Sequence, residues 1–168
     1  TETEEVKSFH PVDDSYFSDA VFIGDSRTVG LHDYGGLNDS TFYATVGMNI
    51  YNLWTEKFCE VDGEKVTLEE ALKAKQYGKI YFQIGINEMG RGTLDGFMTA
   101  YEESVKKFRE LQPDAVIFVQ GIMKVAKEKS DKDPIFNNVG IEQRNERIAA
   151  LADGKNIFYI DMNEVVCD

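Results

Sequence analysis

The chain has 168 residues, of which 18 are basic and 30 are acidic, and its formal net charge at pH 7 is −12. This length suits one domain with a substantial hydrophobic core. The acidic excess disfavours binding to nucleic acids and to anionic membrane surfaces, because both need clustered positive charge. No apolar run approaches the roughly 20 residues of a membrane-spanning helix, so we expect no membrane insertion. Cys59 and Cys167 lack metal-ligand spacing; two free thiols are favoured, and a disulfide between them stays open.

Polar and acidic residues fill positions 1–18, which we expect to form an extended lead-in to one domain over residues 19–168. Within that domain, five short runs are rich in β-branched and aromatic residues. Their hydrophobicity is nearly continuous rather than alternating, which is typical of strands covered on both faces of a parallel sheet. The predicted strands are Ala20–Gly24, Thr41–Val46, Lys79–Ile84, Ala115–Gln120 and Asn156–Asp161.

Helical patterns separate these strands. Thr67 and Glu70 have the spacing of a capping box, in which each side chain satisfies a backbone N–H of the other residue. The predicted helices are Thr28–Asp33, Thr67–Tyr77, Leu94–Leu111 and Val139–Ala152. Alternating strands and helices predict an α/β fold with a mostly parallel five-stranded sheet and helices on both faces. Ligands of such folds bind beyond the carboxyl ends of the strands, so functional residues are expected there.

The first predicted strand ends in Gly24-Asp25-Ser26-Arg27-Thr28. A serine at a strand-to-helix turn presents its hydroxyl at the mouth of the sheet, and the helix N-terminus supplies N–H groups and a positive dipole. Both features suit a nucleophile whose attack generates an oxyanion. The alternative is that Asp25 or Ser26 only caps the helix. The segment is neither a G-x-S-x-G elbow nor a phosphate loop.

The next two strands also end in residues that can donate hydrogen bonds. Gly47 follows the second strand and can present an unobstructed N–H, and Asn87 follows the third and carries an amide. Each alone could be an ordinary turn residue. Together with Ser26 they would converge on one spot, since the carboxyl ends of neighbouring parallel strands meet at one edge. A nucleophile beside two further donors is the arrangement that acyl transfer needs.

These segments resemble the conserved blocks of the SGNH/GDSL hydrolases, a family of serine esterases and acylhydrolases. Val21–Thr28 is similar to the block that carries the serine, Gly47 to the second block, and Gly85-Ile86-Asn87-Glu88 to the third. A later pair, Asn137-Asn138, is similar to an Asn-Asn pair in a bacterial branch of the family. The resemblance implies a flavodoxin-like sheet in a three-layer α/β/α sandwich. It also implies a Ser–His–Asp catalytic set and an oxyanion hole formed by Ser26, Gly47 and Asn87, with no metal or organic cofactor.

Asp25, Arg27 and Glu88 neighbour these positions and are expected to support them, with Arg27 in a structural role. Glu88 replaces the family's usual Asp, which we expect to be tolerated because the asparagine is the donor. The family's Asp-x-x-His block should follow the fifth strand, and is expected beyond Asp168. His10 and His32 do not fit the role of general base by position, and Asp161 is not assigned as the triad acid.

The leading hypothesis is a serine-dependent ester hydrolase acting through an acyl-enzyme on Ser26. The resemblance implies an acylated carbohydrate or small ester as substrate, and a secreted or cell-envelope bacterial location. This segment alone is expected to be inactive or weakly active without its histidine. The alternative is a non-catalytic domain that binds an acyl or glycan group on the same scaffold. A flavodoxin-like nucleotide binder is disfavoured, because no loop is built for phosphate.

Overall fold

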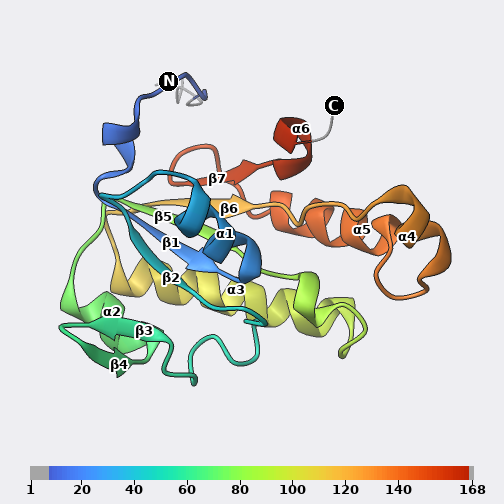
Figure 1. Ribbon diagram of the computed structural model, residues 1–168, viewed down its shortest axis with the longest axis horizontal. Helices are drawn as coiled ribbons and strands as arrows, with labels where there is room; N and C mark the ends of the chain where they lie inside the picture. The colour runs from blue at the N-terminus through green and yellow to red at the C-terminus, as the bar shows by residue number, and fades with distance from the viewer. Residues whose placement is uncertain (1–7, 167–168) are drawn as a thin grey trace, which may run out of the picture.

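The computed structural model describes residues 8–166, in which a five-stranded sheet has helices on both faces (Figure 1). The strands are β1 (Ala20–Gly24), β2 (Thr41–Ala44), β3 (Cys59–Val61), β4 (Glu64–Val66), β5 (Lys79–Gln83), β6 (Val116–Gln120) and β7 (Ile157–Ile160). The helices are α1 (Ser26–Tyr34), α2 (Leu68–Ala74), α3 (Leu94–Leu111), α4 (Lys127–Lys132), α5 (Asn138–Ala149) and α6 (Met162–Val166). Two 3-10 turns, η1 (Asp14–Phe17) and η2 (Ile86–Glu88), complete the list.

The main sheet has the order β2-β1-β5-β6-β7, and all of its strand pairs are parallel. Numbered along the chain, this is the 2-1-3-4-5 order of flavodoxin-like folds. The predicted fold class is therefore confirmed. β1 lies between β2 and β5, so the chain reverses its direction of travel across the sheet beside β1, where a doubly wound fold places its ligand.

The two faces of the sheet are packed differently. On one face, alternate strand residues such as Ile23, Phe82 and Val119 meet buried side chains of α2, α3 and α5 in the larger core. On the other face, Leu31 of α1 and Phe17 of η1 pack against a smaller cluster. Figure 1 shows α3 running along one side of the sheet and α1 on the opposite side.

Five aromatic rings form a ladder across the second face, one ring from each strand. In strand order they are Phe42, Phe22, Tyr81, Phe118 and Phe158, and they stack at centroid distances of 4.8, 4.6, 4.5 and 5.8 Å. Each ring belongs to a register pair with the next. Aromatic pairs of this kind contribute about 0.5–1.5 kcal/mol each beyond area burial, so the ladder favours one register over its alternatives.

Most differences from the predicted elements lie at their ends. The second strand stops at Ala44 rather than Val46, because a turn follows it, in which the Met48 N–H bonds to the Thr45 carbonyl (3.3 Å) and Gly47 has a positive φ. The capping box of Thr67 and Glu70 is present. The helix that it opens ends at Ala74, because Lys75 is extended and the Gly78 N–H bonds to Asp19 instead of closing the helix.

Some elements had not been predicted. The β3–β4 hairpin turns at Asp62 and Gly63, both at positive φ, and this Asp-Gly pair was a hairpin signal in the sequence. Helices α4 and α6 are also additional, and the lead-in contains the turn η1. Cys59 is buried in the core, and burial raises the pKa of its thiol to about 12. Cys167 lies outside the described residues.

Gln112 is a fully buried polar side chain that joins three backbone segments. Its Oε1 accepts from the Tyr77 N–H (2.7 Å), and its Nε2 donates to the carbonyls of Leu72 (2.7 Å) and Lys75 (2.8 Å). These bonds hold the end of α2 and the approach to β5 against the end of α3. The Gln112 amide stabilises the fold, because its removal leaves three backbone groups unpaired, two of them in buried bonds.

We expect Gln112→Ala to lower the free energy of unfolding by about 2–4 kcal/mol, measured by urea denaturation. Gln76→Ala is the matched control, because the exposed Gln76 makes a single bond to the Leu111 carbonyl. The control should change stability by less than about 1 kcal/mol. Equal effects of the two variants would contradict a role for the buried network.

Candidate functional site

The predicted site residues follow three neighbouring strands at the carboxyl edge of the sheet. Gly24 of β1 is in register with Ala44 of β2 and with Gln83 of β5. Ser26, Gly47 and Asn87 come two, three and four residues after these three aligned ends. The chain therefore brings the three segments to one edge of the sheet.

The start of α1 presents Ser26. Asp25 is the N-cap, and its buried carboxylate accepts from the Arg27 N–H (3.1 Å). Because Asp25 does the capping, the exposed Ser26 is not used as a cap. Position 24 requires glycine because the chain of β5 lies close to it: a Cβ there would be 2.5 Å from the Gln83 carbonyl oxygen.

Asp25 and Arg27, the two neighbours of Ser26, are partly or fully removed from water. Burial raises the pKa of Asp25, while its hydrogen bond from the Arg27 N–H and the Arg27 charge act in the opposite direction. The Nη1 atom of Arg27 is buried and has no hydrogen-bond partner among the described residues. Arg27 therefore acts on the Asp25 carboxyl through its charge and its backbone.

Gly47 and Asn87 lie in segments that contact each other. Asn87 Nδ2 donates to the Met48 carbonyl (2.9 Å), directly after Gly47. Gly47 has a φ of +81°, so the turn needs a residue that tolerates the left-handed region. The Met48 N–H closes this turn on the Thr45 carbonyl (3.3 Å), and Thr45 in turn bonds to Gly24. This chain of backbone and side-chain bonds links the ends of all three strands.

Glu88 lies directly after Asn87 and is fully buried. Its Oε1 accepts from the Ile50 N–H (2.5 Å), while Oε2 has no hydrogen-bond partner among the described residues. Burial, opposed by the Ile50 hydrogen bond, raises the pKa of this carboxyl to about 7. The charge of Asp25 adds to the rise, and the charge of Arg144 opposes it. The sequence predicts a supporting role for Glu88, but no pattern in it indicates that this side chain is buried.

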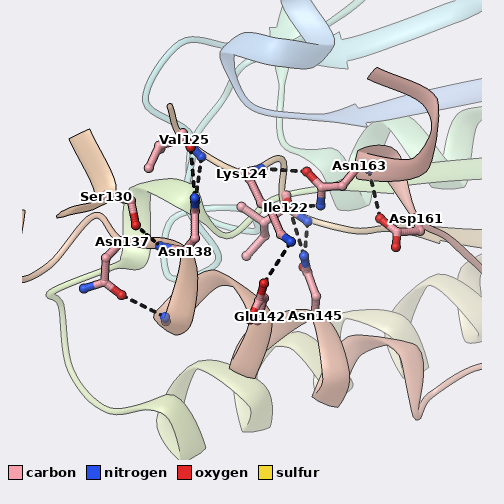
Figure 2. A network of polar contacts seen from close by, with 11 residues as sticks. Ile122, Lys124, Val125, Ser130, Asn137, Asn138, Glu142, Asn145, Asp161 and Asn163 are labelled. Carbon is pink, nitrogen blue, oxygen red and sulfur yellow. Dashed lines mark hydrogen bonds and ion pairs between the residues drawn. The ribbon is translucent and has the colours of Figure 1, made fainter. Parts of the chain in front are cut away.

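A fourth loop at this edge, residues 121–126 after β6, is held by three asparagines, which we name the asparagine clamp: Asn138, Asn145 and Asn163. Each side chain both accepts from and donates to the loop backbone (Figure 2). Asn145 binds both backbone groups of Ile122, at 2.7 and 2.9 Å. In the Asn137-Asn138 pair, Asn137 caps α5 and Asn138 is the clamp residue. The loop is thereby fixed in place.

Neither histidine is placed at the carboxyl edge by its contacts. His32, in the last turn of α1, pairs with Asp33 (3.3 Å) and packs on Phe42 (4.8 Å between centroids). His10 lines a largely apolar cavity of about 510 Å³ against the aromatic ladder, with Phe9 and Tyr81 among its walls. Asp161 directly follows β7 and accepts from the Asn163 N–H (2.9 Å), a turn contact at the start of α6.

Over residues 8–166, no group of three or more His, Cys, Asp or Glu side chains is arranged to hold a metal ion. In the same part of the chain, no helix has the length and apolar character required to cross a membrane.

Residues 22–168 match the family model of the GDSL-like lipase/acylhydrolases. The chain belongs to this family. No curated protein matches it. The GDSL-family fold is shared with a candidate platelet activating factor from Streptococcus pneumonia (17% identity, 92% of this chain and 75% of that chain, TM-score 0.62). It is also shared with a GDSL-like lipase from Bacteroides thetaiotaomicron (14% identity, 92% and 72%, TM-score 0.60).

A third structure with this fold is a family two carbohydrate esterase from Clostridium thermocellum, an active-site mutant in complex with a cello-oligosaccharide. Its identity to this chain is 12%, with 85% of this chain covered and a TM-score of 0.59. The GDSL-family chain spans only 53% of the length of that esterase. At these identities the structures establish the fold that the sequence resemblance implied.

The asparagine clamp of this GDSL-family domain can be tested at its most buried member. We expect Asn145→Ala to lower the free energy of unfolding by about 2–3 kcal/mol, because the buried Ile122 N–H loses its partner and the Ile122 carbonyl keeps only Asn163. Hydrogen exchange at the Ile122 amide should accelerate. Asn52→Ala, at an exposed position, is the control and should change neither quantity. Unchanged exchange at Ile122 would contradict the clamp.

Glu88 should make stability depend on pH. In the unfolded chain its pKa is 4.5, and in the folded chain it is about 7. Between these values the folded state keeps a proton that the unfolded state has lost, so stability falls as pH rises from about 4.5 to about 7. Relative to Glu88→Gln, the wild-type protein should lose about 2–3 kcal/mol over this interval. Parallel stability curves of the two proteins from pH 4.5 to 8 would contradict the assignment.

Proposed function

We propose that this GDSL-family protein hydrolyses ester bonds with Ser26 as the nucleophile. The observation that carries the proposal is the exposed Ser26 in the first turn of α1, beside two strand ends that hold Gly47 and Asn87. The bond from Asn87 to the Met48 carbonyl (2.9 Å) supports it, because it keeps the amide beside the Gly47 turn.

In the proposed reaction, Ser26 Oγ attacks the ester carbonyl carbon and gives its proton to a general base. The carbonyl oxygen becomes an oxyanion that accepts from the N–H groups of Ser26 and Gly47 and from the Asn87 amide. Asn87 has two amide protons. The Met48 carbonyl takes one, so the other is available to the oxyanion. The alcohol leaves with the proton returned by the base, and water then releases the acid from Ser26.

The general base is proposed to be the histidine of an Asp-x-x-His block after Asp168, as the family resemblance implies. The contacts of His10 and His32 favour this over a role for either of them. The proposed substrate is an acylated carbohydrate or a small ester, since carbohydrate esterases are among the proteins of the same fold. A secreted or cell-envelope location is part of the same proposal.

A non-catalytic domain that binds acyl or glycan groups is the second candidate. The observation that favours it is the set of contacts of the two histidines: His10 lines the cavity against the aromatic ladder, and His32 contacts Asp33 and Phe42. Such a domain would retain a ligand at the carboxyl edge without turning it over. Activity of the full reading frame separates the two candidates.

We expect the chain extended through the Asp-x-x-His block to hydrolyse p-nitrophenyl acetate, and Ser26→Ala to abolish this turnover. Asn87→Ala should lower kcat by about 10²–10³-fold, the usual effect of removing an oxyanion donor. Residues 1–168 alone should react barely faster than buffer, because a serine without its base retains only the residual rate. Initial rates of the four proteins, measured side by side, give the answer.

Ser40→Ala is the matched serine control, because Ser40 bonds to the Phe17 carbonyl (2.7 Å) ahead of β2, away from the carboxyl edge. It should keep the turnover of the extended chain. Turnover that survives Ser26→Ala would refute the proposed nucleophile. Strong Ser26-dependent turnover by residues 1–168 would instead assign the base to His10 or His32.

A further inference from the structure

The turn η2 holds the loop after Gly47 at two points. Asn87 donates to the Met48 carbonyl (2.9 Å), and the adjacent Glu88 accepts from the Ile50 N–H (2.5 Å). The three residues Met48, Asn49 and Ile50 are all buried. A short segment fixed at both ends has little freedom, so the orientation of the Gly47 peptide directly before it depends on both bonds.

The neighbours of Glu88 do not satisfy its buried carboxyl fully. The titratable groups that face it come from three elements: Asp25 before α1, Tyr101 of α3 and Arg144 of α5. Glu88 Oε2, Tyr101 Oη and Arg144 Nε are all buried and have no hydrogen-bond partner among the described residues. A buried carboxyl with one N–H partner is a costly way to stabilise a fold.

The position of Glu88 suggests a role that would account for the burial of its carboxyl. It is joined in sequence to Asn87 and in space to the loop of Gly47, the two residues proposed as oxyanion donors. We propose that Glu88 is a positioning residue of this site, whose carboxylate holds the Met48–Ile50 loop so that the Gly47 N–H faces the oxyanion. This role rests on the proposed function, whereas the two bonds that join Asn87 to Met48 and Glu88 to Ile50 belong to the fold itself.

The proposal predicts how the Ile50–Glu88 hydrogen bond changes with pH. Hydrogen bonds to a charged acceptor are stronger than those to a neutral one, and the pKa of Glu88 is raised to about 7. As pH rises through 7, the bond from the Ile50 N–H should strengthen and the loop should tighten. The same ionisation lowers the stability of the fold. A purely structural carboxyl would show no link between its ionisation and Gly47.

The first test needs no activity. Amide chemical shifts of Ile50 and Gly47 are followed from pH 5 to 9 in the wild-type chain and in Glu88→Gln. We expect both amides to titrate with one midpoint near 7 in the wild type and to stay flat in the variant. Asp153→Asn is the control, because Asp153 accepts three backbone N–H groups at the opposite end of β7. It should destabilise the fold and leave the Gly47 titration unchanged. A Gly47 shift that does not follow Glu88 would overturn the proposal.

The second test uses ester turnover by the full reading frame. Glu88→Gln keeps a carbonyl acceptor and removes the charge, so kcat at pH 8 should fall by about tenfold with KM nearly unchanged. Glu88→Ala removes the acceptor, so its kcat should fall further. The ratio of wild-type to Glu88→Gln rates should rise from pH 5 to 8, and this ratio cancels the titration of the catalytic base.

The two proposals fail in different ways. If turnover survives Ser26→Ala, the proposed function fails, and the amide titration still decides whether Glu88 positions Gly47. If turnover depends on Ser26 but Glu88→Gln has the kcat and pH profile of the wild type, the function stands and the positioning role is refuted.

Discussion

Stacking of one aromatic ring from each strand fixes the register on which the rest of the molecule depends. The ladder from Phe42 through Phe22 and Tyr81 to Phe158 runs straight across five parallel strands. A shift of one residue would turn every ring to the opposite face. With the register fixed, β1, β2 and β5 end level with one another, and the segments that carry Ser26, Gly47 and Asn87 meet. The alignment of these three segments thus depends on packing across one face of the sheet.

Buried polar groups serve two different purposes in this fold. Gln112 and the asparagine clamp satisfy backbone groups fully, and the result is a rigid scaffold around the sheet. Glu88, Tyr101 and Arg144 each have a buried polar atom with no hydrogen-bond partner among residues 8–166. Native proteins contain few such atoms. Tyr101 and Arg144 both interact with Glu88, which directly follows Asn87, so these unpaired atoms lie close to the candidate site.

The fold could be predicted from the sequence largely because each strand is buried on both sides. Near-continuous apolar runs such as Ala20–Gly24 are typical of strands covered on both faces, and turn and cap residues mark the boundaries between the runs. The strand ends identified Ser26, Gly47 and Asn87 as candidates because parallel strands bring their ends together. What could not be predicted depends on distant partners. The burial of Glu88 needs α3 and α5 above it, and the clamp needs α5 and α6 to reach a loop up to 41 residues away.

Handedness, rather than size, restricts position 47. An added Cβ at Gly47 would meet no atom within 4 Å, so the turn has room for a side chain, yet its φ of +81° suits few L-residues. At this φ, L-alanine would cost about 1–2 kcal/mol, whereas the backbone of a D-residue favours positive φ. Natural variation has no access to the mirror-image residue. Position 47 therefore favours glycine because of its backbone conformation, although an added methyl group would meet no neighbouring atom.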